Sequence, residues 1–214
     1  MKYKLVIFDW QGTLTDVVGQ FCKQFCHVAS SLGLPMINND KLNPLLHLDI
    51  CTLVQTLFPE PENHTKRMRM VECFTNYRMH HGHDVCLYDG VQFLLERLNR
   101  HDIFIGIATA ASQQTITTEL ACTGLSPLID AYKTPDHTLC KPAPDMLNEL
   151  MDELGVNKSE TVMVGDSRCD FEAAQHANID FIGIHMANNA LVSDIVESSN
   201  CVAKDISSLV TLLN

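Results

Sequence analysis

Short apolar runs alternate with helical patterns along most of this 214-residue chain, and this alternation limits the possible folds more than any other feature. The strand-like runs cover residues 5–8, 103–108, 161–164 and 181–184, and the helical patterns cover 91–98, 112–122, 142–154, 171–177 and 205–213. Pro142 suits the first turn of one helix, and Gly124 and Gly155 suit the ends of two. Repeated strand–helix units predict an α/β fold with a doubly wound parallel sheet.

Residues 15–85 interrupt this alternation. They show helical periodicity at 17–32, 45–57 and 62–79 without a clear strand pattern, and prolines punctuate the connections. The sequence therefore predicts two domains. One is an α/β core of residues 1–14 and 86–214, and the other is an α-helical domain of residues 15–85, inserted after the first strand.

The formal net charge of −11 predicts that nucleic acid is not a partner, because a phosphate backbone calls for a basic surface. No apolar run approaches the roughly 20 residues needed to span a bilayer, so no membrane association is expected. The start of the chain, Met1-Lys2-Tyr3-Lys4, leads directly into a strand pattern and favours a cytoplasmic location. Cys22, Cys26 and His27 are expected to pack in a helix rather than bind a metal.

Reactive side chains follow several of the predicted strands. Asp9 follows residues 5–8 and begins the stretch Asp9-Trp10-Gln11-Gly12-Thr13. Thr109 follows residues 103–108, and Lys141 precedes Pro142 at a predicted helix start. Asp166 follows residues 161–164, with Asp170 further along the same segment. Because the carboxyl ends of parallel strands meet at one edge of a sheet, we expect these groups to form one pocket.

The predicted pocket combines three carboxylates, a hydroxyl and an ammonium group. Clustered carboxylates need a hard dication to hold them together, and oxygen ligands suit Mg²⁺. An ionised carboxylate can attack phosphorus, while Lys141 and Thr109 can stabilise the transferring oxygens. Each residue alone is more commonly a turn, a helix cap or a helix start. Their order and common edge favour phosphoryl transfer from a small phosphorylated substrate.

With these motifs in this order, the chain resembles the haloacid dehalogenase (HAD) superfamily. The similar branch contains phosphoglycolate phosphatase and related sugar phosphatases and carries a helical cap after the first strand. Asp9 matches the family's first motif, Thr109 its second, Lys141 its third and Gly165-Asp166-x-x-x-Asp170 its fourth. Leu87-Tyr88-Asp89-Gly90-Val91 resembles the return from cap to core, so the resemblance covers nearly the whole chain.

The resemblance implies a role for each matched residue. Asp9 would attack the phosphorus and bind Mg²⁺, Asp166 would bind the metal, and Asp170 would bind it or hold its waters. Lys141 would steady the nucleophile and the phosphate. Thr109 and the backbone N–H of Ala110 would hold phosphate oxygens. A capped domain of this size is expected to be a monomer or a weak homodimer.

Gln11 departs from the family pattern. Family phosphatases carry an aspartate two residues after the nucleophile, which protonates the leaving group and then deprotonates the attacking water. An amide cannot exchange a proton at any useful pH, although the backbone carbonyl of Gln11 can still bind Mg²⁺, as this position does in the family. The sequence therefore predicts an intact metal site and slow turnover. Asp16 and His47 are nearby candidates in sequence for another base.

Three interpretations of Gln11 stay open. The first is a Mg²⁺-dependent phosphatase of low activity that works through an aspartyl phosphate. The second is a module that binds a phosphate ester without turning it over. The third is altered chemistry of the phosphonoacetaldehyde hydrolase or haloacid dehalogenase type. Phosphonoacetaldehyde hydrolases need a Schiff-base lysine in the cap, for which Lys41 is the nearest candidate. Haloacid dehalogenases do not need a metal, whereas the acidic residues here indicate one.

In this family the cap closes over the core and selects the leaving group. Residues 45–52 are the part of the cap expected near the site. His47 and Asp49 are polar among apolar neighbours there, and a role at a helix start is the stronger expectation for them than substrate contact.

Overall fold

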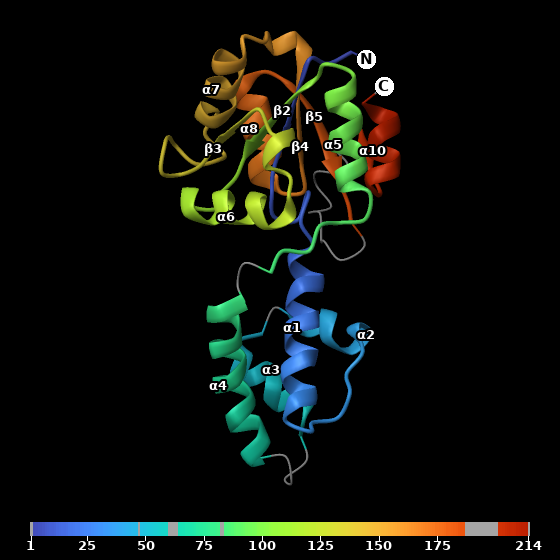
Figure 1. Ribbon diagram of the computed structural model, residues 1–214, viewed down its shortest axis with the longest axis vertical. Helices are drawn as coiled ribbons and strands as arrows, with labels where there is room; N and C mark the ends of the chain where they lie inside the picture. The colour runs from blue at the N-terminus through green and yellow to red at the C-terminus, as the bar shows by residue number, and fades with distance from the viewer. Residues whose placement is uncertain (1, 47, 60–63, 82–83, 187–200, 214) are drawn as a thin grey trace. The chain divides into compact units, whose positions relative to one another are not determined.

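The computed structural model describes residues 2–46, 48–59, 64–81, 84–186 and 201–213. The chain divides into two compact units, a core unit of Met1–Asp16 with Val85–Asn214 and a helical unit of Val17–Asp84 (Figure 1). Thr15 bridges Leu87, and the N–H of Asp16 donates to the carbonyl of Cys86 over 2.8 Å. These pairings attach Thr15 and Asp16 to the core unit.

Among the described residues, six parallel strands form one sheet in the core unit, in the order β3-β2-β1-β4-β5-β6. They are β1 (Leu5–Phe8), β2 (Phe104–Ala108), β3 (Ala131–Lys133), β4 (Thr161–Gly165), β5 (Asp180–Ile184) and β6 (Val202–Ala203). Phe8 of the central β1 lies opposite Ile107 of β2 and Val164 of β4. The predicted α/β class with a parallel sheet is confirmed, and β3 and β6 are strands that the sequence pattern did not reveal.

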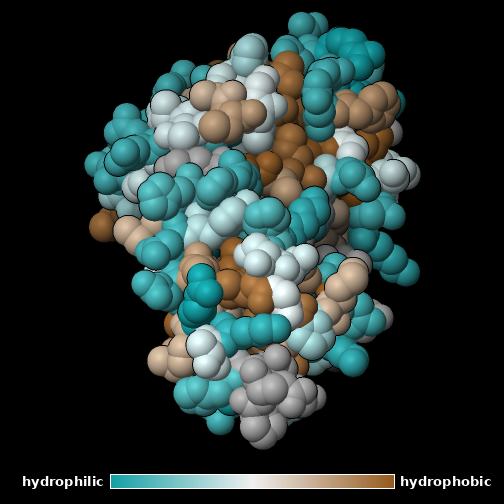
Figure 2. All heavy atoms as spheres, turned by 60° about the horizontal axis from the view of Figure 1, so that its bottom comes forward, coloured by the Kyte–Doolittle hydropathy of each residue, from teal (hydrophilic) through white to brown (hydrophobic). Residues whose placement is uncertain are grey.

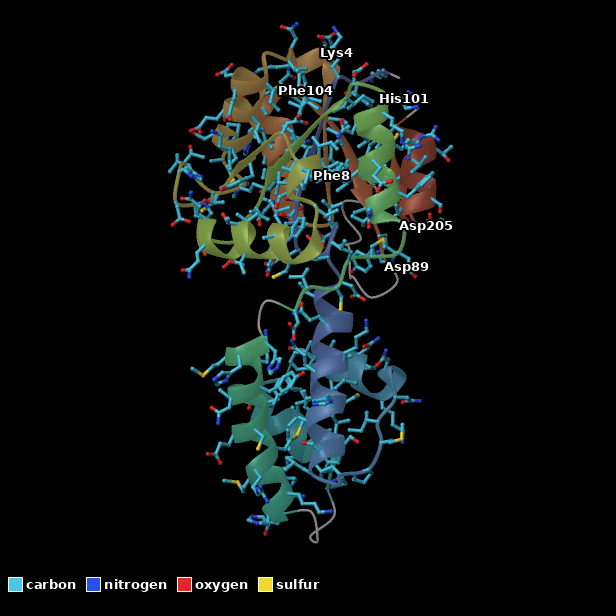
Figure 3. The ribbon with its side chains drawn as sticks, viewed as in Figure 1. Lys4, Phe8, Asp89, His101, Phe104 and Asp205 are labelled. Carbon is cyan, nitrogen blue, oxygen red and sulfur yellow. The ribbon has the colours of Figure 1, made fainter. Side chains whose placement is uncertain are left out.

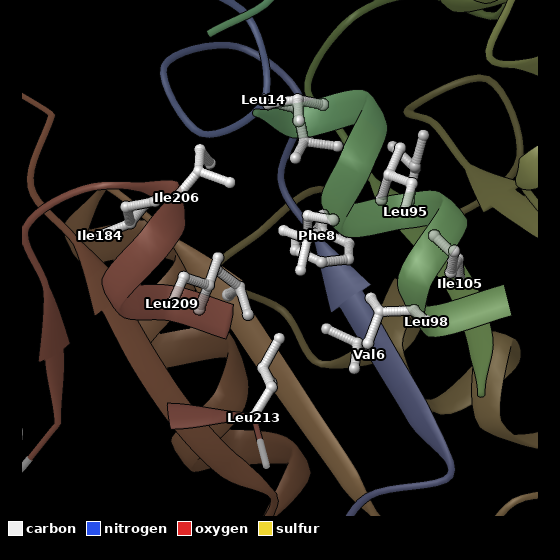
Figure 4. Close-up of a cluster of buried hydrophobic side chains, with 14 of the residues drawn as sticks. Val6, Phe8, Leu14, Leu95, Leu98, Ile105, Ile184, Ile206, Leu209 and Leu213 are labelled. Atoms are coloured by element: carbon white, nitrogen blue, oxygen red, sulfur yellow. The ribbon is translucent and has the colours of Figure 1, made fainter. Parts of the chain in front are cut away.

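Helices cover one face of the sheet through a large hydrophobic cluster. Val6 and Phe8 of β1 pack in this cluster with buried residues of α5 (Val91–Arg100) and α10 (Ile206–Leu212), as Figure 4 shows. Buried residues of α6 (Gln113–Thr123) join the same cluster. Burial of this many aliphatic side chains is the main force that holds the helices against the sheet.

The other face of the sheet carries a second cluster. Successive side chains of a strand point to opposite faces, so Leu5 and Ile7 face away from Val6 and Phe8. They pack with buried residues of α7 (Asp145–Leu154) and α8 (Arg168–Ala177). With both faces covered, the edge at the carboxyl ends of the strands is where polar groups can gather.

The prediction that a helix begins at Pro142 was wrong. Pro142 lies in a turn, and α7 begins only at Asp145, with Pro144 at its N-cap position. A residue that precedes proline is pushed out of the helical region, so Ala143 before Pro144 cannot continue a helix. Lys141 therefore lies in a turn ahead of the helix rather than at its start.

The direction of the strands can be followed in Figure 3. Lys4 and Phe104 are labelled at the amino ends of β1 and β2, and Phe8 marks the carboxyl end of β1. Short 3₁₀ turns complete the connections at η1 (Asn43–Leu45), η3 (Ser126–Leu128) and η4 (Lys158–Glu160). The segments that leave the carboxyl ends of β1, β2 and β4 carry the residues singled out in the sequence.

The helical unit is built from α1 (Val17–Ser31), α2 (Asn39–Leu42), α3 (Ile50–Leu57) and α4 (His64–His81). These helices share their own hydrophobic core. Phe74 of α4 meets Phe21 and Phe25 of α1 edge to face, at centroid distances of 5.1 and 5.4 Å. Cys22 is buried in the same core, as a packed side chain would be.

The prediction of one helix over residues 45–57 was wrong. The 3₁₀ turn η1 ends at Leu45, and α3 begins only at Ile50. Asp49 is the N-cap of α3, since its carboxylate accepts hydrogen bonds from the N–H groups of Cys51 and Thr52. The expected helix-start role of Asp49 is confirmed, whereas His47 lies outside the described residues.

Charge is divided unevenly between the two units. Residues 17–84 contain six Lys or Arg and six Asp or Glu, so the net charge of −11 falls on the core unit. Figure 2 shows a mainly hydrophilic surface with smaller hydrophobic areas, and Met36, Met68 and Met79 are exposed apolar residues of the helical unit. None of the described helices combines the length and apolar character needed to cross a bilayer.

Candidate active site

The carboxyl ends of β1, β2 and β4 bring three of the predicted site segments together. Phe8 pairs with Ile107 and Val164, so Asp9 follows β1 directly beside the ends of β2 and β4. The N–H of Asp9 donates to the carbonyl of Val164 over 2.9 Å, which extends the sheet by one bond. Asp9 is only 8% exposed, so its carboxylate is held in a largely dry position.

Lys141 contacts Asp9 although 132 residues separate them in the sequence. Its ammonium group lies 2.7 Å from Oδ1 of Asp9, 2.6 Å from Oδ1 of Asp170 and 2.7 Å from the carbonyl oxygen of Ala108. An ammonium group has three protons, and each has an acceptor here. The Lys141 side chain is 7% exposed, so these contacts replace its hydration.

Asp170 is fully buried at the start of α8. Its Oδ2 accepts hydrogen bonds from the backbone N–H and the hydroxyl of Ser167, and the hydroxyl of Ser167 accepts from the N–H of Asp170. This capping box fixes the helix start. Since Oδ1 of Asp170 contacts Lys141, both carboxylate oxygens have donors, and Asp170 holds Lys141 in place between two acids.

Asp166 is oriented by the turn that follows Asp9. Thr13 is fully buried, and its hydroxyl donates to Oδ1 of Asp166 over 2.9 Å. Gly12 adopts a φ of +87°, which favours glycine. A Cβ atom on Gly12 would lie 2.4 Å from Oδ2 of Asp166, so only glycine leaves room for this carboxylate.

The three acids are close enough to share a cation. One carboxylate oxygen from each of Asp9, Asp166 and Asp170 lies within 4.8 Å of the other two. In the part of the chain that the structure describes, no other group of three or more His, Cys, Asp or Glu side chains meets this condition. Oxygen donors at this spacing fit a hard dication such as Mg²⁺.

Burial and mutual repulsion shift the pKa values of these groups. Burial, together with the nearby carboxylates of Asp170 and Asp166, raises the pKa of Asp9 to about 7 against the opposing effect of Lys141. Burial also raises the pKa of Asp166 to about 6. Burial lowers the pKa of Lys141, but Asp9 and Asp170 outweigh it and raise that pKa to about 12. Burial and repulsion thus disfavour the ionised forms of Asp9 and Asp166 in the absence of a metal. A bound cation would offset both effects.

Thr109 and Ala110 form the loop between β2 and α6. Thr109 is buried, and its oxygen accepts a hydrogen bond from the N–H of Ala111 over 3.1 Å. A hydroxyl that accepts one bond still has a proton to donate. Ala110 is exposed, and Ser112 caps α6 just beyond it. Thr109 is therefore a buried hydroxyl at the carboxyl end of β2, next to Ala108, whose carbonyl oxygen accepts a hydrogen bond from Lys141.

A sequence model described as haloacid dehalogenase-like hydrolase matches residues 6–184, which takes in most of β1, the helical unit and β2 to β5. The chain belongs to this family. The resemblance drawn from the four motifs is thereby confirmed at the level of the family.

Two relatives of this haloacid dehalogenase-like hydrolase have phosphatase names. A pyrophosphatase PpaX from Oceanobacillus iheyensis is 29% identical over 181 residues, covering 84% of this chain and 82% of the relative. A phosphoglycolate phosphatase from Vibrio parahaemolyticus is 25% identical over 194 residues, covering 87% and 85%. The crystal structure of a hydrolase from Streptococcus pneumoniae has the same fold, with a TM-score of 0.69 at 20% identity over 92% of this chain and 98% of that one.

Gln11, the residue that departs from the family pattern, is exposed and lies next to the buried Gly12. Its backbone pairs with Thr15, which closes the turn that follows Asp9. Asp16 ends the core unit and is half-buried, while Lys41 is exposed on α2 of the helical unit. His47, which the sequence offered with Asp16 as a candidate for another base, lies outside the described residues.

Three residues that orient the site were not assigned a role from the sequence. Thr13 holds Asp166, Ser167 holds Asp170, and Glu119 accepts a hydrogen bond from Trp10. A signal existed for Ser167, because a serine three residues before an acid is a capping-box pattern. No short-range pattern connects Glu119 with Trp10, since 109 residues separate them.

Proposed function

We propose that this hydrolase is a Mg²⁺-dependent phosphatase that acts on a small phosphorylated metabolite and forms a phosphoryl group on Asp9. The supporting observation is the close cluster of Asp9, Asp166 and Asp170 with Lys141 bonded to Asp9. The phosphatase names of the two relatives agree with this function. In this proposal Asp9, Asp166 and the backbone carbonyl of Gln11 would hold the metal, and Asp170 would hold Lys141 beside it.

The first chemical step belongs to Asp9. An oxygen of its carboxylate forms a bond to phosphorus, and the bond from phosphorus to the leaving oxygen breaks with its electron pair on that oxygen. Bound Mg²⁺ supplies positive charge that screens the phosphate from the carboxylates. Lys141 neutralises charge that develops on the transferring oxygens, and Thr109 with the N–H of Ala110 holds them.

Gln11 decides which leaving groups depart readily. Its amide has no proton to give, so an alkoxide leaving group would depart without help. General acid–base catalysis typically contributes about 10²–10⁴-fold, or about 3–5 kcal/mol of the barrier. A phenolate, a carboxylate or a phosphate leaves without needing a proton. The site therefore favours activated esters, acyl phosphates and phosphoanhydrides over alkyl esters.

In the second step, hydrolysis of phosphoryl-Asp9, the absence of a base at Gln11 slows the reaction for every substrate. Water must attack the phosphorus of phosphoryl-Asp9, and a base must take its proton. With Gln11 in the place of that base, the phosphoryl group stays on Asp9 longer than in a family phosphatase. The proposed enzyme is consequently limited by hydrolysis of its own intermediate.

Phosphate release from p-nitrophenyl phosphate with Mg²⁺ tests this function. The chain is compared with Gln11→Asp, and Asp9→Asn serves as the control that removes the nucleophile. We expect slow release by the chain, faster release by Gln11→Asp and none by Asp9→Asn. If neither the chain nor Gln11→Asp releases phosphate, phosphoryl transfer is the wrong chemistry for this site.

Gln11 also supports a second candidate, a module that binds a phosphate ester and does not turn it over. In that case the chain is inert, Gln11→Asp is active, and the chain still binds inorganic phosphate in the presence of Mg²⁺. Altered chemistry is distinguished by its substrates, because turnover of a haloacid or a phosphonate in place of a phosphate ester would support it.

A further inference from the structure

Trp10 connects the loop that carries Asp9 to a helix from a distant part of the chain. Its indole is fully buried in the hydrophobic cluster of the core unit, and the indole N–H donates to Oε2 of Glu119 over 2.5 Å. Glu119 lies on α6 and is itself 7% exposed. A carboxylate seldom occupies such a place without a partner, because burial removes its hydration.

The position of Glu119 on α6 is one that a hydrophobic residue would ordinarily fill. Ile116 and Leu120, three residues before it and one after it, are buried in the same hydrophobic cluster. Helix residues three or four apart lie on one face, so Glu119 belongs to the face that packs on the core. An acid at this point weakens packing, and its bond to Trp10 is a contact that a hydrophobic side chain could not make.

Trp10 is also the centre of the turn that follows the nucleophile. Its carbonyl oxygen accepts hydrogen bonds from the N–H groups of Leu14 and Thr15, each over 3.0 Å, and from the hydroxyl of Thr15 over 3.2 Å. The residue between Asp9 and Gln11 is therefore held at both its side chain and its backbone. Movement of the Trp10 indole would move Asp9 and Gln11 with it.

Helix α6, which carries Glu119, begins just after the loop of Thr109 and Ala110 that is proposed to hold the phosphate. α6 starts at Gln113, directly after the segment that carries Thr109 and Ala110. Its first turn is fixed by the side chain of Ser112 and by Asp136, whose Oδ2 accepts a hydrogen bond from the N–H of Gln113 over 2.6 Å. One helix thus contacts the nucleophile loop at Glu119 and leads into the Thr109 loop at its start.

We infer that Glu119 is a positioning residue for the reaction of Asp9. It holds the Trp10 indole and thereby fixes Asp9 and Gln11 relative to the loop of Thr109 and Ala110. This inference rests on the proposed phosphatase function. A displaced nucleophile lowers the rate of the chemical step, whereas Thr109 and Lys141 keep their own contacts to the phosphate. Loss of the Glu119–Trp10 bond is expected to lower kcat and leave KM nearly unchanged.

The test compares Glu119→Leu, Glu119→Gln and Trp10→Phe in the Gln11→Asp background, where turnover is fast enough to measure. Glu119→Leu removes the acceptor, Glu119→Gln keeps a carbonyl acceptor, and Trp10→Phe removes the donor while keeping an aromatic ring. Glu96→Gln, on the exposed surface of α5, is the matched control for loss of a carboxylate. Rates are measured with p-nitrophenyl phosphate and Mg²⁺.

A spectroscopic measurement accompanies the rates. The chain has a single tryptophan, so its ¹⁵N-labelled form gives one indole N–H signal in an NMR spectrum. We expect that signal to exchange slowly with solvent in the starting protein and in Glu96→Gln. In Glu119→Leu it should shift upfield and exchange at least about tenfold faster, because a buried N–H has lost its acceptor. This signal reports whether the Glu119–Trp10 bond is present, and the change in kcat at constant KM reports whether that bond positions Asp9.

The expected result is a fall in kcat of about tenfold or more for Glu119→Leu and Trp10→Phe, with KM within about twofold. The kcat of Glu119→Gln should lie between the kcat of these two variants and that of Glu96→Gln. If Glu119→Leu fails to fold, Trp10→Phe and Glu119→Gln decide the matter. Unchanged kcat in folded variants would overturn the positioning role alone. A Gln11→Asp protein that is itself inert would overturn the proposed function, and the positioning role with it.

Discussion

Gly12 and Asp166 approach each other so closely that a Cβ atom on Gly12 would lie 2.4 Å from Oδ2 of Asp166. The turn after Asp9 and the acid after β4 are therefore packed as one unit, although 153 residues separate Thr13 from the carboxylate that it holds. The proposed sites of Mg²⁺ binding and of nucleophilic attack should therefore be sensitive to this turn.

Gly12→Ala is expected to weaken both folding and metal binding. The new methyl group would displace Asp166, and the φ of +87° would add backbone strain, so we expect a loss of about 1–3 kcal/mol in the free energy of unfolding. Gly124→Ala is the matched control, because Gly124 also has a positive φ and nothing lies within 4 Å of its added Cβ. Mg²⁺ titration by calorimetry should show weaker binding for Gly12→Ala only, and equal Mg²⁺ affinity in both variants would contradict this account.

Lys141→Met is expected to abolish phosphoryl transfer and to destabilise the core unit. It removes the cation from between two buried carboxylates, and breaking such a pair typically costs about 3–5 kcal/mol. Lys133→Met is the control, since the carboxylates that pair with Lys133 are 43% and 51% exposed, so that solvent screens them and a loss of only about 1 kcal/mol is expected. Denaturant unfolding near neutral pH measures the stability loss of each variant. Similar losses for the two variants would show that Lys141 behaves as a surface charge.

Stability without metal should fall as pH rises, because of Asp9 and Asp166. Their pKa values in the folded protein, about 7 and about 6, lie above the ordinary value of 3.8. The folded state thus binds protons more tightly than the unfolded chain, and the resulting stability is lost as pH rises from about 4 to about 7. The proposed Mg²⁺ site requires ionised acids, so the effect of Mg²⁺ on the melting temperature should be larger near pH 8 than near pH 5.5. Asp9→Asn should reduce this pH dependence, and a Mg²⁺ effect that is constant across this range would contradict it.

A phosphorylated form of the chain should accumulate with a donor that needs no proton for its leaving group. With acetyl phosphate and Mg²⁺, Asp9 gains one phosphoryl group and acetate leaves as an anion. Because Gln11 cannot activate water, the modified form persists, and intact-mass measurement after acid quench should detect it. Gln11→Asp should carry much less of it at steady state, and Asp9→Asn none. Failure to see it in the chain, together with rapid phosphate release, would point to another base.

Much of the fold follows from local pattern. The strands at β1, β2, β4 and β5 are runs of apolar and β-branched residues, and their boundaries were predicted to within a residue or so. β3 and β6 have three and two residues, too few for a periodic signal, and they exist because neighbouring strands offer them partners. The start of α7 was misjudged because Pro142 suits a first turn, while the second proline at 144 sets the actual boundary.

The sequence predicted that Asp9, Lys141, Asp166 and Asp170 would gather at one edge of the sheet, but not how they contact one another. Asp9, Thr109 and Asp166 each follow a strand whose end is readable in the sequence. The contact of Lys141 with both Asp9 and Asp170 depends on a turn placed by tertiary packing. The bonds from Thr13 to Asp166 and from Trp10 to Glu119 join segments more than 100 residues apart, so no periodicity or spacing rule could reveal them.

The place of the only indole in the chain has a practical consequence. Trp10 adjoins the proposed nucleophile, is shielded from solvent and touches a carboxylate that can quench or shift its emission. The protein therefore carries its own optical probe at the point where chemistry is proposed to occur. Binding of a cation, arrival of a phosphate and transfer to Asp9 should each register as a separate change in ultraviolet fluorescence, which can be followed in real time without a label.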